Sequence, residues 1–80
     1  MISFPRFDVE RYSIIVTRHA MVRAFERCVD AELVLRIVKH GSIERFGKHG
    51  IRFIRNGKRT LICVGEIHGE AIKILTVEEG

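Results

Sequence analysis

The chain has 80 residues, 46% of them hydrophobic and 30% charged, and its fourteen Lys and Arg against ten Asp and Glu give a formal net charge of +4 at pH 7. This length fits a single domain over residues 1–80, and the apolar content excludes an intrinsically disordered chain. No apolar run approaches the roughly 20 residues that span a bilayer, and the first residues lack the apolar centre of a signal peptide, so we expect a cytoplasmic protein without membrane contact. The positive charge favours a polyanionic partner, RNA foremost.

The first expected elements are a short strand and a helix. The apolar, β-branched run at 12–16 predicts a strand or an extended arm. Thr17 can cap a helix over 18–27, because its hydroxyl can accept a hydrogen bond from a first-turn amide. Four residues follow the i, i+3, i+4, i+7 spacing of one buried helical face: Met21, Ala24, Phe25 and Cys28.

A second helix is predicted between Asp30 and Gly41. Asp30 is a capping residue and Gly41 a stop signal, while the cations at 39–40 suit the negative end of a helix. Because only residues 28–30 separate the two helices, we expect a tight helical hairpin or corner. One apolar stripe should face the core: Leu33, Val34, Ile37 and Val38.

Beyond the second helix, the pattern changes to β-rich runs separated by glycines. Asn56-Gly57 predicts a two-residue hairpin, because a type I′ turn needs positive φ at both central positions and these residues tolerate it. Turns are also expected at 47–50 and at His68-Gly69. Helices followed by strands predict an α+β domain, in which two N-terminal helices pack on a four-stranded antiparallel meander and 12–16 adds an N-terminal strand or arm. The four strands of the meander are expected at 42–46, 51–55, 59–64 and 71–77.

The first predicted helix carries a stripe of basic residues, which we call the α-helical stripe: His19, Arg23 and Arg27, four residues apart. Such spacing drifts by only about 40° per step, so the three side chains share one side of the helix. In RNA cleavage, the imidazole can serve as base for the 2′-hydroxyl and the guanidinium groups can neutralise charge on the phosphate. The alternative is a solvated surface, because the stripe lies opposite the apolar face predicted above and Glu26 can pair with Arg23.

A second group of cations surrounds the expected Asn56-Gly57 turn. In a two-residue hairpin, Arg52 and Arg59 project from the same side of the sheet, together with Ile54 and Leu61. They can bind nucleic acid, or they can simply extend along the sheet edge. The turn residues are either solvated or anchors for a phosphate backbone. The candidate nucleic-acid-binding residues are Arg52, Arg55, Lys58 and Arg59.

Metal and cofactor motifs are missing from the sequence. There is no CxxC, no HExxH and no phosphate-cradling glycine loop. We therefore expect neither a metal nor a cofactor, and we expect Cys28 and Cys63 to be free thiols.

The order of these features resembles that of a family of small prokaryotic domains, domain-of-unknown-function family 4258. The similarity runs from about residue 17 to residue 77 and includes an HAxxRxxxR motif after a Thr, a second helix that ends at a glycine, and glycine-punctuated strands that close on a Thr-Val pair. Members often have Gly-Ile-Ser where this chain has residues 28–30, and a tyrosine where it has Glu78. The matching residues are His19, Ala20, Arg23, Arg27, Gly41, Ile74, Leu75, Thr76 and Val77.

That family looks like a distant relative of the RelE, ParE and BrnT toxins, whose fold is two N-terminal helices on a four-stranded antiparallel sheet. Such toxins are commonly metal-independent ribonucleases paired with an antitoxin, although ParE-like relatives act on gyrase. The resemblance implies a RelE-like fold and a toxin–antitoxin role. It also implies catalytic roles for the α-helical stripe and for Thr76, with Arg52 and Arg59 as further candidates on the sheet.

Three hypotheses follow from the sequence. The first is a toxin-like ribonuclease in which His19 is the base, and it predicts a concave basic surface between the first helix and the sheet. The second is a noncatalytic module that binds nucleic acid or an acidic protein such as an antitoxin, and it predicts an exposed His19 without converging groups. The third is a homodimer formed through an exposed edge strand.

Overall fold

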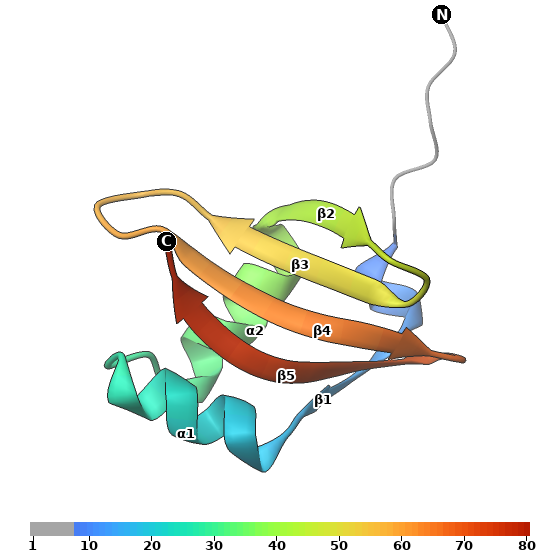
Figure 1. The fold of residues 1–80 in the computed structure, drawn as a ribbon, viewed down its shortest axis with the longest axis horizontal. Helices are drawn as coiled ribbons and strands as arrows, with labels where there is room; N and C mark the ends of the chain where they lie inside the picture. The colour runs from blue at the N-terminus through green and yellow to red at the C-terminus, as the bar shows by residue number, and fades with distance from the viewer. Residues whose placement is uncertain (1–7) are drawn as a thin grey trace, which may run out of the picture.

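The computed structural model describes residues 8–80 as a mixed α+β domain, which confirms the predicted class (Figure 1). The expectation that the first residues are not a signal peptide concerns a segment that lies mostly outside this range. The elements in chain order are η1 (Val9–Arg11), β1 (Ser13–Val16), α1 (Arg18–Glu26), α2 (Ala31–His40), β2 (Ser42–Phe46), β3 (Gly50–Arg55), β4 (Leu61–His68) and β5 (Ala71–Glu79).

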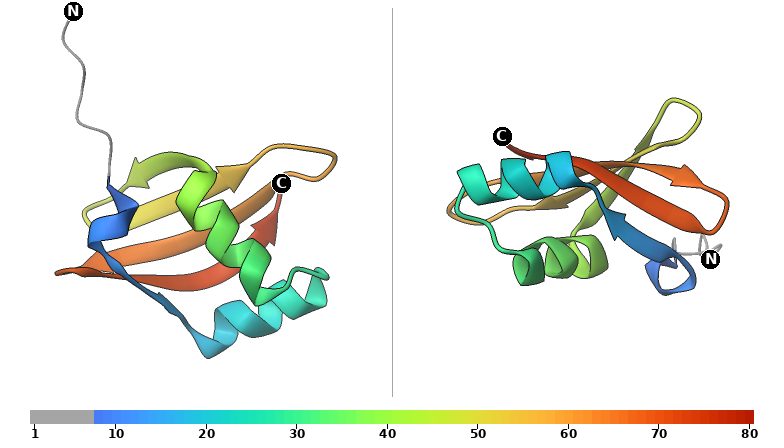
Figure 2. Two further views of the ribbon diagram at one scale, coloured as in Figure 1. Left: turned by 180° about the vertical axis from the view of Figure 1, so that it is seen from behind. Right: turned by 90° about the horizontal axis from the view of Figure 1, so that it is seen from below.

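The sheet has five strands in the order β1-β5-β4-β3-β2, which corrects the predicted count of four, because the segment expected as a strand or arm at 12–16 joins the sheet as β1. β2 to β5 form an antiparallel meander, and β1 joins it parallel to β5, with Val16 opposite Ile74. The fifth strand forms because Ile14 and Val16 pack against the core from the edge of β5. α2 lies across one face of the sheet and α1 lies at its edge beside β5, while no helix among the described residues covers the opposite, open face (Figure 2).

The outer edge of β5 is covered by two different elements. β1 pairs with its first half, and α1 lies against its second half. The Thr17 hydroxyl donates to the Ile74 carbonyl at 2.7 Å and accepts from the Ala20 amide at 3.2 Å, so the predicted cap of α1 also fixes the helix to β5. Farther along, Arg27 Nε donates to the Val77 carbonyl at 3.0 Å. These bonds occupy backbone carbonyls that an open strand edge would present to other chains.

The predicted core side of α2 is confirmed, whereas on α1 only Ala24 of the four predicted residues is buried. Val34, Ile37 and Val38 are fully buried. On α1 the buried residues are Ala20 and Ala24, while Met21, Phe25 and Cys28 are exposed. α1 lies at the sheet edge, where only a narrow stripe of the helix touches the core, and alanines allow the closest approach to it.

The turn between the helices is a Schellman motif, the αL ending that usually employs glycine. The Val29 amide donates to the Ala24 carbonyl at 2.8 Å and the Cys28 amide to the Phe25 carbonyl at 3.0 Å. Cys28 has φ 57°, and it is the only non-glycine residue in the described range with positive φ. The adjacent Val29 is buried, so the turn is anchored to the core.

The predicted two-residue hairpin at Asn56-Gly57 is wrong. Arg55 pairs with Leu61, which leaves residues 56–60 as a longer loop, and Gly57 does not have positive φ. In the two-residue register Phe53 would face Thr60, whereas it faces Cys63 in the structure. This shift by three residues reverses the faces of β4 and places Leu61 and Cys63 in the core.

Turns form near both of the other predicted places, although the second consists of residues 69–70 instead of His68-Gly69, because His68 pairs with Ala71 at the end of β4. Gly47 and Gly69 have φ of +58° and +60°, a conformation that glycine adopts without strain. β2 has its predicted bounds, and β3 begins one residue early. β4 starts and ends later than predicted, at Leu61 and His68, and β5 continues to Glu79.

Candidate functional site

The α-helical stripe is partly free and partly held by the fold. His19 and Arg23 are exposed, and His19 makes no hydrogen bond or ion pair with any residue in the described range. Arg23 Nη1 lies 3.8 Å from Glu26 Oε1, the pairing that the sequence suggested. Arg27 is partly buried and bonds the Val77 carbonyl, so the last member of the stripe lies against β5.

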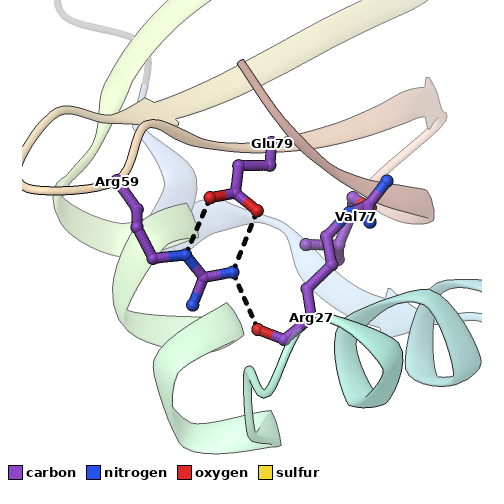
Figure 3. A network of polar contacts seen from close by, with 4 residues as sticks. All are labelled: Arg27, Arg59, Val77 and Glu79. Carbon is purple, nitrogen blue, oxygen red and sulfur yellow. Dashed lines mark hydrogen bonds and ion pairs between the residues drawn. The ribbon is translucent and has the colours of Figure 1, made fainter.

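Arg59 joins three elements at the C-terminal end of β5 (Figure 3). Its guanidinium binds the Glu79 carboxylate through Nε at 2.9 Å and Nη2 at 3.2 Å, and Nη2 also donates to the Arg27 carbonyl at 2.8 Å. The hydrogen bond to Arg59 lowers the pKa of Glu79, and the same bond raises the pKa of Arg59. Of the sequence-predicted residues, Arg27 and Arg59 are thus brought together, and the bond from the Arg59 guanidinium to the Arg27 carbonyl connects the 56–60 loop to the end of α1.

Arg52 and Thr76 lie on the open face of the sheet. They occupy one row, in which Arg52 and Thr76 are both opposite Val64. With strands about 4.8 Å apart, their backbones are separated by about 10 Å. The Arg52 guanidinium lies 4.2 Å from the centre of the Phe46 ring and 3.7 Å from Glu44 Oε1.

Arg52 and Arg59 therefore do not project together, which corrects the prediction from the two-residue hairpin. Arg52 extends over the open face. Arg59 belongs to the 56–60 loop and reaches Glu79, which is opposite Leu61 on the helix-covered side. The three-residue register shift of β4 lengthens the connection after β3 and places Arg59 in that loop, away from Arg52.

The remaining predicted cations, Arg55 and Lys58, are exposed and make no ion pair within residues 8–80. Arg55 borders a cleft of about 400 Å³ between the end of α2 and the end of β3. Its rim also carries Arg36 and His40. They were not predicted as site residues from the sequence, because charged and polar side chains are common on the exposed side of a helix end. A larger cleft of about 800 Å³ is lined by both signs of charge, including Asp8, Glu10, Lys39 and Arg45.

The thiols are free and differ in environment. Cys28 is exposed, while Cys63 is buried, and burial raises the pKa of Cys63 to about 12. No cluster of three or more His, Cys, Asp or Glu side chains in the described part of the chain could hold a metal ion. The rings of His49 and His68 stack with centroids 5.6 Å apart, and His68 contacts Glu66 at 3.2 Å.

No family model, curated protein or solved structure matches this chain. The similarity to the RelE-type toxins therefore stays a prediction from the sequence. Among residues 8–80, no helix combines the length and apolar character that crossing a membrane requires.

Proposed function

We propose that the protein is a noncatalytic basic module that binds single-stranded nucleic acid, foremost RNA. The observation that carries this proposal is the environment of His19, which is exposed and without a partner in the described chain. A general base acts within hydrogen-bond reach of its substrate, alongside groups that stabilise the developing charge. Here the arginines that the ribonuclease hypothesis requires have other contacts.

Those contacts support binding over catalysis. Arg27 and Arg59 bond backbone carbonyls and Glu79, and Arg52 is held between Glu44 and the Phe46 ring. Other cations are exposed and without a carboxylate partner among the described residues, which suits contacts to a phosphate backbone. They are Arg18, Lys39, Lys48, Arg55 and Lys58.

The outer side of α1 adds an aromatic ring to this charge. Phe25 is 84% exposed, and it follows Arg18 by seven residues, or two helical turns. Exposed rings beside cations offer stacking platforms for unpaired bases, and such stacking is worth about 1–3 kcal/mol per base. This combination favours a single strand over a duplex, whose bases are already stacked.

The test is binding of a mixed-sequence single-stranded RNA, measured by fluorescence anisotropy over a range of salt concentrations in the presence of a chelator. Arg55→Gln with Lys58→Gln should weaken binding and reduce the salt slope by about 0.7 for each phosphate that these side chains neutralise. Phe25→Ala should weaken binding with little change in slope. Lys73→Gln is the control, because Lys73 lies opposite Glu66 on the open face. Absence of salt-sensitive binding by the parent protein would refute the proposal.

A toxin-like, metal-independent ribonuclease is the second candidate, because the Arg27–Val77 bond aligns the α-helical stripe with the half of β5 that contains Thr76. General acid–base catalysis is typically worth about 10² to 10⁴ in rate. If this candidate is right, the parent protein cleaves RNA in chelator and His19→Ala loses that activity, while His49→Ala, a histidine outside the stripe, retains it. An antitoxin-like acidic protein would compete with RNA for the same cations.

A further inference from the structure

We propose that the cleft between the C-terminal end of α2 and the end of β3 is a phosphate-binding site that takes one phosphodiester of the bound nucleic acid. This inference rests on the proposed function and names a place of contact for it. The cleft has a volume of about 400 Å³, and its polar lining includes Arg36, His40, Ser42, Arg55 and Asn56. It is distinct from the α-helical stripe.

The charges around this cleft suit an anion. Arg36 and Arg55 are guanidinium groups on its two sides, and no carboxylate is among the described residues that line it. Arg55 has no ion pair within that range. Arg36 Nη2 lies 3.6 Å from Glu32 Oε1, but both side chains are mostly exposed, and such surface pairs are weak. The Arg36 guanidinium can therefore turn to a phosphate, which two arginines match with paired N–H donors.

Neutral groups of the cleft can add hydrogen bonds. The Thr60 hydroxyl donates to Asn56 Oδ1 at 3.4 Å. The oxygen of the Asn56 amide is therefore occupied, and its NH₂ group remains available as a donor. The hydroxyl of Ser42 and the imidazole of His40 complete the polar lining. A phosphate oxygen can accept from each of these groups.

The cleft is held in shape by Gly41, the residue that ends α2. Its amide donates to the Ile37 carbonyl at 2.7 Å. A Cβ at this position would lie 2.6 Å from the Ile37 oxygen and 2.8 Å from the Ile54 oxygen, which are backbone atoms with little freedom to move. Only glycine allows the end of α2 to approach β3 this closely, so Arg36 and Arg55 face one preformed space.

The experiment follows backbone amide shifts of the ¹⁵N-labelled full chain during three titrations: inorganic phosphate, a five-nucleotide single-stranded RNA, and the same RNA with a 5′-phosphate. The proposal expects the amides of Gly41, Ser42 and Asn56 to shift with both oligonucleotides. The double variant Arg36→Gln, Arg55→Gln should bind RNA at least tenfold more weakly. The matched control Arg11→Gln, Lys73→Gln removes two exposed cations that lie outside the cleft and outside the proposed RNA contacts, and it should leave the shifts at these three amides unchanged.

The outcomes separate this inference from the proposed function. If RNA binds equally well to parent and cleft variant, with shifts elsewhere, the phosphate site is wrong and the proposed function stands. If inorganic phosphate shifts the three amides but neither oligonucleotide does, the site takes free phosphate, and the phosphodiester assignment is overturned. If only the 5′-phosphorylated RNA shifts them, the ligand is a terminal monoester, which also overturns that assignment. Both variants are exposed substitutions, and spectral dispersion verifies their folding.

Discussion

Cys28 adopts a backbone conformation that favours glycine over residues with a Cβ. It occupies the αL position of the Schellman motif, with φ 57°, where glycine is the usual residue. A residue with a Cβ is strained there by about 1 kcal/mol. The side chain is exposed and carries no packing role that offsets this cost.

Cys28→Gly should therefore stabilise the protein by about 0.5–1 kcal/mol, which corresponds to a rise in Tm of roughly 2–8 °C for a domain of this size. Cys28→Ser is the control, since it removes the thiol and retains the Cβ, and it should leave Tm near that of the parent. Thermal unfolding followed by circular dichroism measures both. Equal Tm values for the glycine and serine variants would show that the turn is unstrained.

The buried thiol of Cys63 makes the free energy of unfolding depend on pH in the alkaline range. Burial raises its pKa from 9.0 to about 12, so above pH 9 the unfolded chain loses a proton that the folded chain keeps. The stabilisation is complete below pH 9 and is lost as pH rises toward 12, at about 1.4 kcal/mol per pH unit.

Urea unfolding under reducing conditions at several pH values from 8 to 11 measures this slope. Cys63→Ala should be less stable at pH 8 because of the cavity, but its free energy of unfolding should fall less steeply with pH. Cys28→Ser retains the buried thiol and should show the steep fall. Parallel slopes for parent and Cys63→Ala would mean that other groups cause the alkaline loss.

At the scale of elements, Gly41 and Gly57 have different structural roles, although both lie shortly after the end of a helix or strand. Gly41 joins α2 to β3 at a distance that excludes any side chain, whereas a Cβ at Gly57 would meet only the Arg59 oxygen, at 3.8 Å. Gly57 also lacks positive φ. The two positions form a matched pair for substitution by alanine.

Gly41→Ala should destabilise the domain by about 1–3 kcal/mol, because the backbone must shift to relieve the overlap. Gly57→Ala should be neutral or stabilising by up to about 1 kcal/mol, since alanine restricts the unfolded chain. Chemical denaturation distinguishes them. Tolerance of Gly41→Ala would show that α2 can move away from β3, and the cleft would then not be preformed.

The Arg59 cluster connects the 56–60 loop, the end of α1 and the end of β5. Arg59→Gln should lower Tm, because it removes the forked bond to Glu79 and the bond to the Arg27 carbonyl. The pKa of Glu79 is lowered from 4.5, so this part of the stability is present above pH 4.5 and is lost as pH falls through the lowered value.

Thermal unfolding at pH 7 and at pH 3 tests this assignment. Glu79→Gln should reduce the difference between the two Tm values, since the amide does not titrate. Arg59→Lys keeps the charge but not the fork, and it should recover only part of the stability. An Arg59→Gln variant with unchanged Tm and weakened RNA binding would instead assign Arg59 to ligand contact.

For the whole molecule, local signals predicted the elements and failed to predict how they meet. Caps and stop signals gave both helices and most strand bounds, because they act within a few residues. The register of β4 could not be predicted from the sequence. Residues 61–64 are apolar at four consecutive positions, so the alternation of apolar and polar residues does not indicate which side chains face the core. On α1 the pattern predicted that Ala24 is buried but missed Ala20, because a small alanine carries little hydrophobic signal beside Met21 and Phe25.

The candidate site was predictable only as residue types. The sequence located the α-helical stripe and the cations near Asn56. It could not show that Arg27 and Arg59 are used to join elements, because those bonds span 50 and 32 residues. The cleft with Arg36 likewise depends on a contact between segments that are distant in the sequence, because the end of α2 approaches β3 at Gly41.

The parallel pairing of β1 with β5 also determines when the domain can form during synthesis. β5 lies inside the sheet, between β1 and β4, yet it is the last of these elements to be made, and the Thr17–Ile74 bond joins residues 57 positions apart. Until β5 has left the ribosome, β1 lacks its only partner strand and β4 lacks one of its two. The core also needs Ile72, Ile74 and Val77 of β5, so the domain completes its fold only after β5 has cleared the exit tunnel.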